Sequence, residues 1–148
     1  QLIYPDKRGI RGCLEPRDKD FLPGGKKQGL CCPIGTPKDG NPLVIAEGWA
    51  TASSIYEATG IPVLVAFDAG NIKHIGVASR KRYPEALIVF AADNDQWTKG
   101  NPGLREAKNS AKAVSGVIAI PEFPDAHLEK ISKGEFVFVI SPKDWIKY

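Results

Sequence analysis

Residues 42–48 read Pro-Leu-Val-Ile-Ala-Glu-Gly, and residues 86–95 read Ala-Leu-Ile-Val-Phe-Ala-Ala-Asp-Asn-Asp. Each stretch is a short apolar run typical of a buried β-strand, and each ends in carboxylates: Glu47 in the first, Asp93 and Asp95 in the second. In an open parallel sheet with helical connections, ligands bind beyond the carboxyl ends of the strands. We therefore expect these three carboxylates to lie at one edge of a sheet.

After residue 41 the chain alternates apolar runs with stretches of helical periodicity. Apolar residues recur three or four positions apart, at Ala52 and Ile55 and again at Leu104, Ala107 and Ala111. This alternation predicts βαβ units, and hence an α/β, Rossmann-like fold with a mainly parallel sheet flanked by helices. The predicted strands are residues 42–46, 62–67, 86–92 and 117–120, the helices are residues 49–59, 71–82 and 103–115, and a helix at 126–132 and a strand at 136–140 complete the domain.

The first 41 residues differ in composition, because glycine, proline and charged residues interrupt every apolar piece. Dense turn chemistry of this kind predicts a small β-rich element of two to four short antiparallel strands. We therefore place a boundary between this N-terminal element, residues 1–41, and a catalytic domain, residues 42–148. Because the chain contains no methionine, we expect it to be part of a longer protein, inert alone if its activity needs the remainder.

Charge and cysteine content narrow the class of protein. The net charge is +3, and its excess lies in residues 1–41, which hold eight Lys and Arg against five Asp and Glu. This surplus is a weak indication of nucleic-acid contact, for which Lys26 and Lys27 are the candidates. Three cysteines, of which Cys31 and Cys32 are adjacent, fit neither a disulfide framework nor a zinc site and predict a reducing, cytoplasmic location. No apolar run approaches the roughly 20 residues of a membrane span.

The carboxylates suit a divalent cation. Asp93 and Asp95 are one residue apart, so in extended geometry they point the same way. Their mutual repulsion is relieved by a bound cation, and carboxylate oxygens are the ligands that Mg²⁺ uses when it holds phosphate groups. Two simpler interpretations remain open: Asp-Asn-Asp is also ordinary turn chemistry, and Glu47 could cap the helix that follows it.

Three neighbouring positions could approach a phosphate. Gly48 lets the backbone turn closely, and the helix that follows it offers unpaired N–H groups to an anion. Asp68 and Asn71 follow the second predicted strand, where a helix N-cap and a role in binding phosphate or metal are equally favoured. We expect Trp49 in the core, with stacking on a base as the alternative.

Five stretches of the chain resemble a known family when they are taken together. They are residues 21–27 (Phe-Leu-Pro-Gly-Gly-Lys-Lys), 45–52 (Ile-Ala-Glu-Gly-Trp-Ala-Thr-Ala), 66–71 (Ala-Phe-Asp-Ala-Gly-Asn), 91–95 (Ala-Ala-Asp-Asn-Asp) and 100–103 (Gly-Asn-Pro-Gly). Glutamate-glycine after a first strand and Asp-x-Asp after a third are the signature of the Toprim domain. The combination resembles the Toprim domains of conjugative-plasmid primases and of phage-type primase-helicases.

The resemblance implies a DNA primase, a nucleotidyltransferase that synthesises RNA primers on a single-stranded DNA template from ribonucleoside triphosphates during plasmid or phage replication. It implies Glu47 as general acid/base or metal ligand, and Asp93 and Asp95 as ligands of Mg²⁺, for which Mn²⁺ can substitute. It also implies a helicase domain or subunit as a partner. The chain departs from the family after Ile120, where further acidic residues are not recognisable. Two alternatives remain: a Toprim-type nuclease, and a non-catalytic nucleic-acid-binding domain.

Overall fold

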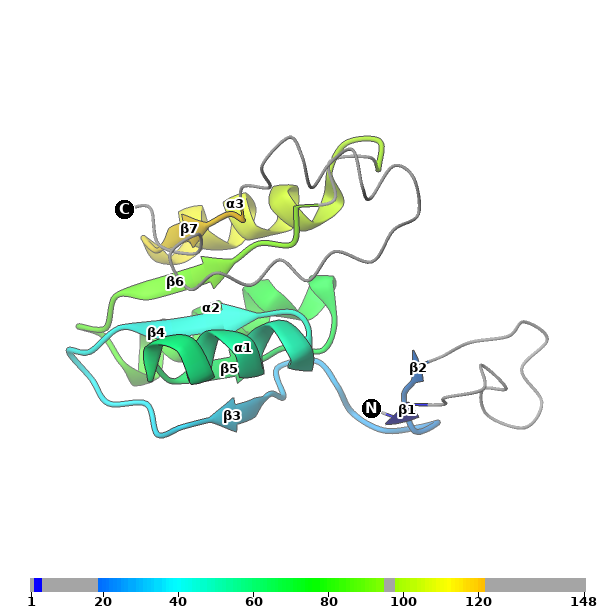
Figure 1. The fold of residues 1–148 in the computed structure, drawn as a ribbon, viewed down its shortest axis with the longest axis horizontal. Helices are drawn as coiled ribbons and strands as arrows, with labels where there is room; N and C mark the ends of the chain where they lie inside the picture. The colour runs from blue at the N-terminus through cyan, green and yellow to red at the C-terminus, as the bar shows by residue number, and fades with distance from the viewer. Residues whose placement is uncertain (1, 4–18, 95–97, 122–148) are drawn as a thin grey trace.

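The computed structural model describes residues 2–3, 19–94 and 98–121, and its centre is a five-stranded sheet (Figure 1). The strands lie in the order β3-β5-β4-β6-β7. Strands β4, β5, β6 and β7 are mutually parallel where they pair, and β3 runs antiparallel to β5. The bounds are β3 Cys32–Ile34, β4 Leu43–Ala46, β5 Val63–Val65, β6 Ile88–Ala91 and β7 Val117–Ala119, with helices α1 Trp49–Thr59, α2 Ala69–Arg82 and α3 Pro102–Val114.

This architecture confirms the predicted α/β fold, and each strand and helix predicted after residue 41 within the described residues lies within two residues of its expected ends. The chain passes from β4 through α1 to β5 on one side, and then through α2 to β6 on the other side of β4. The strand order therefore reverses between β4 and β6. In open α/β sheets the crevice at such a reversal, outside the carboxyl ends of the strands, is where ligands bind.

The two faces of the sheet are covered by different helices, with α1 in front and α2 and α3 behind in Figure 1. Alternate residues of each strand point to opposite faces, so each face has its own core. The α2–α3 core centres on Ile45, Ile88 and Phe90, which are fully buried. The α1 core contains Val63 and Val65 of β5. Nearly continuous apolar strands such as β4 are the expected result of burial on both faces.

Helix α2 approaches β6 through small residues. A Cβ atom at Gly76 would lie 2.7 Å from Cζ of Phe90, and one at Gly116 would lie 3.0 Å from Cε2 of the same ring. The absence of a side chain at these two positions is what lets the helix and the turn before β7 contact the Phe90 ring. Arg80 lies near the end of α2, beside the amino end of β6. It donates hydrogen bonds to the carbonyl oxygens of Val114, Pro84 and Ala86 at 3.0, 2.8 and 2.8 Å.

The N-terminal part of the chain is divided between two sheets. Strands β1 (Leu2–Ile3) and β2 (Lys19–Asp20) pair antiparallel as a separate two-stranded sheet, as expected of a β-rich segment. Strand β3 instead adds to the edge of the main sheet, where its central Pro33 pairs with Leu64. The boundary after residue 41 stays a prediction.

Trp49 corrects one expectation. This residue is 47% exposed rather than buried, because it is the first residue of α1, while Ala52 and Ile55 supply the buried face of that helix. The helix and strand predicted at 126–132 and 136–140 lie outside the described residues, as do Asp95 and Cys13. The described helices include none that is long and apolar enough to cross a membrane.

Candidate active site

Two of the three predicted acidic residues come together at the point where the strand order reverses. Glu47 directly follows β4, and Asp93 lies two residues beyond the end of β6. These strands are parallel neighbours in which Ala46 is paired with Ala91, so the two carboxylates emerge at the same edge of the sheet. Both side chains are partly buried. The expectation that the carboxylates share an edge is thus confirmed for this pair, and Asp95 lies outside the described residues.

The backbone around Glu47 is fixed on both sides. Its carbonyl oxygen accepts a hydrogen bond of 2.7 Å from the N–H of Phe67, which continues the β4–β5 ladder beyond the strands themselves. Gly48 is the N-cap of α1, and its extended backbone (φ −96°, ψ 149°) starts the helix immediately after the carboxylate. Glu47 therefore precedes the cap position, and the first turn of α1 begins beside it. A helix N-terminus at this place favours a bound anion.

A pair of asparagines that the sequence analysis did not single out holds the loop after β6. Asn94 donates to the carbonyl of Pro121 at 3.1 Å, and its own side-chain oxygen accepts from Asn101 at 2.9 Å. Asn101 is also the N-cap of α3 and accepts from the N–H of Leu104. The residue beside Asp93 is thereby tied both to the start of α3 and to the end of β7. Alternation of Asp and Asn with a later Asn-Pro-Gly was the only sequence signal for this arrangement.

The residues present fit a magnesium ion. Mg²⁺ is commonly bound by one or two carboxylates, keeps several waters and takes further oxygens from substrate phosphates. Glu47 and Asp93 supply two carboxylates from neighbouring strands, and both retain access to solvent. Within residues 19–94 and 98–121 no group of three or more His, Cys, Asp or Glu side chains is assembled as a metal cage. The two described carboxylates are the number that Mg²⁺ commonly takes from a protein.

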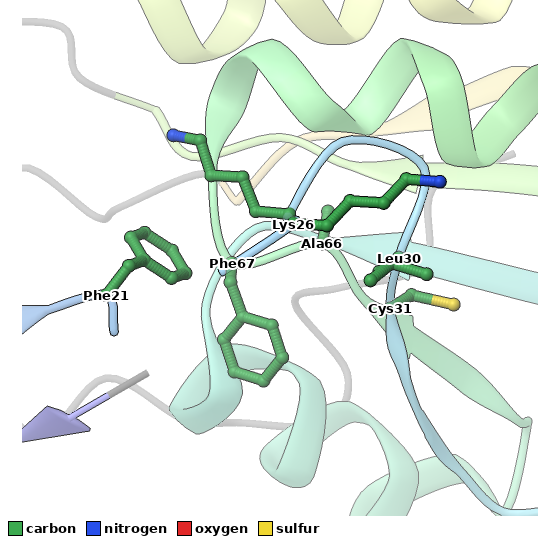
Figure 2. A pocket seen from close by; sticks show the side chains of 7 residues that line it. Phe21, Lys26, Leu30, Cys31, Ala66 and Phe67 are labelled. Atoms are coloured by element: carbon green, nitrogen blue, oxygen red, sulfur yellow. The ribbon is translucent and has the colours of Figure 1, made fainter. Parts of the chain in front are cut away.

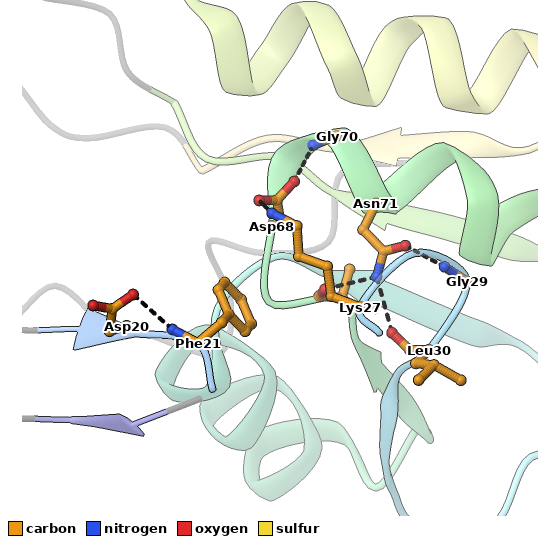
Figure 3. Close-up of polar contacts among 9 residues, drawn as sticks. Asp20, Phe21, Lys27, Gly29, Leu30, Asp68, Gly70 and Asn71 are labelled. Atoms are coloured by element: carbon orange, nitrogen blue, oxygen red, sulfur yellow. Dashed lines mark hydrogen bonds and ion pairs between the residues drawn. The ribbon is translucent and has the colours of Figure 1, made fainter. Parts of the chain in front are cut away.

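Residues 27–30, which we call the strap, cross the start of α2 and are tied to it by hydrogen bonds and an ion pair (Figure 3). Asn71 makes the central contacts: it accepts from the N–H of Gly29 at 2.7 Å and donates to the carbonyls of Leu30 and Ala66 at 2.9 and 3.0 Å. Its side chain is 3% exposed, so these bonds are made in a buried position. The structure thus gives Asn71 a structural role, and its contact with phosphate stays a prediction.

Asp68 serves the strap and the helix at once. Its carboxylate caps α2 by accepting from the N–H of Gly70 at 2.9 Å, and it binds Nζ of Lys27 at 2.6 Å. The side-chain hydrogen bond from Lys27 lowers the pKa of Asp68 below its ordinary value of 3.8, and the Gly70 and Asn71 amides act in the same direction. The N-cap interpretation of Asp68 is therefore confirmed, while its predicted contact with phosphate or metal stays a prediction.

The two adjacent lysines, which the sequence treats alike, have different surroundings. Lys27 is engaged by Asp68 and lies over the ring of Phe21, 5.0 Å from its centroid. Lys26 makes no ion pair or hydrogen bond with any residue that the structure describes, and it is exposed. Of the two, Lys26 is the cation available to a ligand.

A pocket of about 170 Å³ lies between the strap and the end of β5 (Figure 2). Phe21 and Phe67 line one side, and Leu30 and Cys31 line the other. Phe67 has a left-handed backbone (φ 61°), a conformation that a bulky residue rarely adopts and that is often found at functional sites. Burial, with a smaller effect of Cys32, raises the pKa of the Cys31 thiol above its ordinary value. No sequence signal joined Phe21 to Phe67, because they lie far apart in the chain.

An α/β sheet with two carboxylates at the carboxyl ends of neighbouring strands, where the strand order reverses, defines the class of protein as a doubly wound α/β domain. A family model described as the Toprim domain matches residues 42–129, and the chain belongs to this family.

Two curated relatives carry the name DNA primase TraC, both from Escherichia coli. One is 35% identical over 119 residues, which is 76% of this chain and 8% of the relative. The other is 42% identical over 85 residues, which is 55% of this chain and 8% of the relative. The chain therefore spans a small part of these relatives. No solved structure matches the chain significantly.

Proposed function

We propose that this chain is the Toprim catalytic core of a DNA primase, which synthesises RNA primers on single-stranded DNA with Mg²⁺. The observation that carries the proposal is the emergence of Glu47 and Asp93 from adjacent parallel strands at the reversal of strand order. Similarity to two proteins named DNA primase supports the same reaction.

In the proposed reaction the 3′-hydroxyl oxygen of the primer attacks the α-phosphorus of a ribonucleoside triphosphate. A new O–P bond forms, the bond between the α-phosphorus and the bridging oxygen breaks, and pyrophosphate leaves. Glu47 accepts the proton of the 3′-hydroxyl, and Asp93 and Asp95 would hold Mg²⁺. When bound, the ion would neutralise the charge that develops on the phosphate oxygens. The chain contributes positioning, through the fixed backbone of Glu47 and the start of α1 at Gly48, where N–H groups face an anion.

The proposed partners are single-stranded DNA, ribonucleoside triphosphates and a helicase domain or subunit. The excess positive charge of the first 41 residues supports contact with the template strand. Lys26, whose ammonium is not engaged by the described residues, is the stronger candidate for that contact, and Lys27 supports it from its ion pair with Asp68.

The test is the double variant Asp93→Asn/Asp95→Asn, compared with Glu57→Gln on the exposed face of α1 as a matched control. Calorimetry with Mn²⁺ is expected to show weak binding to the unchanged chain and to the control, and none to the double variant. Primer synthesis on single-stranded DNA is expected to fall in parallel. Unchanged Mn²⁺ binding by the double variant would overturn the metal assignment. Mg²⁺-dependent cleavage of labelled single-stranded DNA without synthesis would identify a nuclease instead.

A further inference from the structure

The pocket between the strap and β5 is lined by neither Glu47 nor Asp93, and most of its side chains belong to neither hydrophobic core. Its lining combines two phenyl rings, the apolar Leu30 and Ala66, the thiol of Cys31 and two lysines. The amine of Lys26 is exposed, whereas that of Lys27 lies over the Phe21 ring and is paired with Asp68. Aromatic faces beside an exposed cation are the elements with which proteins hold single-stranded nucleic acid: the rings stack on bases and the cation contacts the backbone phosphates. The residues therefore offer complementary chemistry to both parts of a nucleotide unit.

The size and position of the pocket indicate what part of such a strand it takes. A cavity of about 170 Å³ has room for one ring system and is well below the roughly 300–1,000 Å³ of pockets that enclose a whole drug-sized ligand. Two of its lining residues, Ala66 and Phe67, donate backbone hydrogen bonds to the carbonyls of Ala46 and Glu47, at 2.8 and 2.7 Å. The pocket thus adjoins Glu47 on the β5 side, while Asp93 adjoins it on the β6 side.

We propose that this pocket holds one base of the single-stranded DNA template, stacked on Phe21 and Phe67, with Lys26 at an adjoining phosphate. The proposal rests on the function proposed above, in that the strand it binds is the template. The side chains that line the pocket include no amide, carboxylate or hydroxyl, and their strong hydrogen-bonding groups are the ammoniums of Lys26 and Lys27, of which Lys27 is paired with Asp68. Stacking on aromatic faces tolerates every base, so we expect the pocket to accept any base, as template-directed synthesis on arbitrary sequence requires.

The strand is favoured over a free nucleotide as the occupant by the number of interactions available. Two lysines, one of them paired with Asp68, and a pocket for a single ring give a mononucleotide few interactions. A base that belongs to a strand is presented at high local concentration once neighbouring phosphates have bound, so the same pocket contributes fully. The neighbouring phosphates are expected to meet the exposed Lys26 and the partly exposed Lys27, which both line the pocket.

The experiment compares a fluorescent oligothymidylate of about ten nucleotides with an abasic oligomer of equal length and charge, without metal, by anisotropy on the 148-residue chain. The oligothymidylate is expected to bind several-fold more tightly. Phe21→Ala is expected to remove most of this difference, a loss on the order of tenfold, while Phe21→Trp retains it. Leu22→Ala is the matched control, because Leu22 is 68% exposed and does not line the pocket. Equal binding of the two oligomers, or an unchanged difference in Phe21→Ala, would overturn the proposal.

A second readout reports on the pocket itself. In a Cys13→Ser/Cys32→Ser background, Cys31 is the remaining thiol, and its alkylation by N-ethylmaleimide is expected to slow several-fold with the oligothymidylate but not with the abasic oligomer. Protection by free ribonucleoside triphosphates and not by the oligothymidylate would overturn the assignment to the template.

The pocket proposal and the catalytic proposal can be tested separately, because one predicts a difference in affinity between the two oligomers and the other predicts a dependence of synthesis on Glu47. Glu47→Gln is expected to keep the preference for oligothymidylate over the abasic oligomer in the absence of metal. Loss of synthesis with this preference intact supports both proposals. If synthesis depends on Glu47 but the chain binds both oligomers equally, the pocket proposal alone is overturned. If the chain prefers the oligothymidylate but synthesis does not depend on Glu47, the catalytic proposal alone is overturned.

Discussion

Charged residues at the two ends of the parallel sheet have different surroundings. At the amino end of β6, Arg80 is engaged by carbonyl oxygens from Val114, Pro84 and Ala86 and joins the ends of α2 and α3 to the turn before the strand. At the carboxyl end of β4 and β6, Glu47 and Asp93 emerge side by side with partial access to solvent. The charged group at the amino end is hydrogen-bonded to backbone carbonyls. The charged groups at the carboxyl end are carboxylates that are partly exposed to solvent.

We expect residues at the amino end to act chiefly on stability, and the carboxylates at the carboxyl end to act chiefly on the proposed reaction. Like charges brought together at one edge oppose folding slightly, whereas a guanidinium that satisfies several carbonyls favours it. Substitutions at the two ends should therefore affect different measurements, and the following predictions test that separation.

The largest expected effect is on synthesis, at Glu47. In the full-length protein, Glu47→Gln is expected to reduce primer synthesis by about 10²-fold or more, the usual contribution of a general acid or base. Because glutamine keeps the shape and removes a negative charge near Asp93, the free energy of unfolding is expected to stay within about 0.5 kcal/mol or rise slightly. Steady-state synthesis and urea unfolding on the same preparation check both. If Glu47 served only the helix start, the variant would instead lose about 1 kcal/mol and keep its rate.

Arg80→Ala should show the reverse pattern. Its hydrogen bonds to Val114, Pro84 and Ala86 would be removed and their carbonyls left without this donor, at an expected cost of about 2–3 kcal/mol in unfolding. Binding to single-stranded DNA by the folded protein should not change. Lys81→Ala, at the exposed neighbouring position, is the control and should stay within about 0.5 kcal/mol. A DNA-binding defect in a stably folded Arg80→Ala protein would contradict the distinction between the two ends.

Asn71 is expected to affect both stability and DNA binding, because its side chain is buried and also holds the strap. Asn71→Ala removes the hydrogen bonds to Gly29, Leu30 and Ala66 and is expected to cost about 1–3 kcal/mol. It should also weaken binding of oligothymidylate, since the strap carries one wall of the pocket. Lys73→Ala, exposed on α2, is the comparison. Thermal unfolding and anisotropy are measured on the same variant. If Asn71→Ala lowers stability but leaves oligothymidylate binding unchanged, the strap is held in place by other interactions.

The two lysines provide a smaller contrast. Lys26→Ala should flatten the dependence of log affinity on log salt by about 0.7 for each single-strand phosphate that the lysine neutralises. Lys27→Ala should change that slope less, because its ammonium is already paired, and should cost about 0.2–1 kcal/mol in stability, as expected for a pair whose side chains are 50% and 33% exposed. Lys38→Ala controls for net charge. Identical salt slopes in the Lys26 and Lys38 variants would mean that Lys26 is an ordinary solvated charge.

The smallest effect is on the acid dependence of stability. The pKa of Asp68 is lowered in the folded chain, chiefly by the Lys27 hydrogen bond, so the contribution is present above the unfolded pKa of about 4 and is lost as pH falls through the folded pKa. Asp68→Asn keeps a capping oxygen but removes this titration. Urea midpoints at about pH 5 and about pH 3 should therefore differ less in the variant than in the unchanged chain. An equal difference would show that other carboxylates dominate.

The fold followed from the sequence because hydrophobic periodicity is a local signal. The apolar run of residues 42–46 and the three-residue spacing of Ala52 and Ile55 were sufficient to place β4 and α1. The position of Glu47 and Asp93 then followed from the rule that parallel strands present their carboxyl ends at one edge. Trp49 was placed wrongly, because its residue type suggested burial although its position at the first turn of α1 left it exposed.

The pocket and the strap could not be predicted, because they depend on interactions between distant segments. Nothing local distinguishes Lys26 from Lys27, and only the place of Asp68 in space assigns a partner to one of them. Likewise, Asn71 was interpreted as a cap or a ligand-binding residue, although its oxygen and nitrogen are used by the strap and the end of β5. The local sequence around such polar residues is compatible with several hydrogen-bond partners. Which partner is used depends on segments that are distant in the sequence.

The short β3 strand at the sheet margin has a consequence for self-association. An unpaired strand edge is a template on which another chain can form a sheet, and natural proteins protect such edges with short strands and proline. Strand β3 is three residues long with Pro33 at its centre, so it covers the edge of β5 and provides little backbone for a further strand. We therefore expect the margin of the sheet beside the pocket to recruit other copies of the chain less readily than an open edge of β5 would.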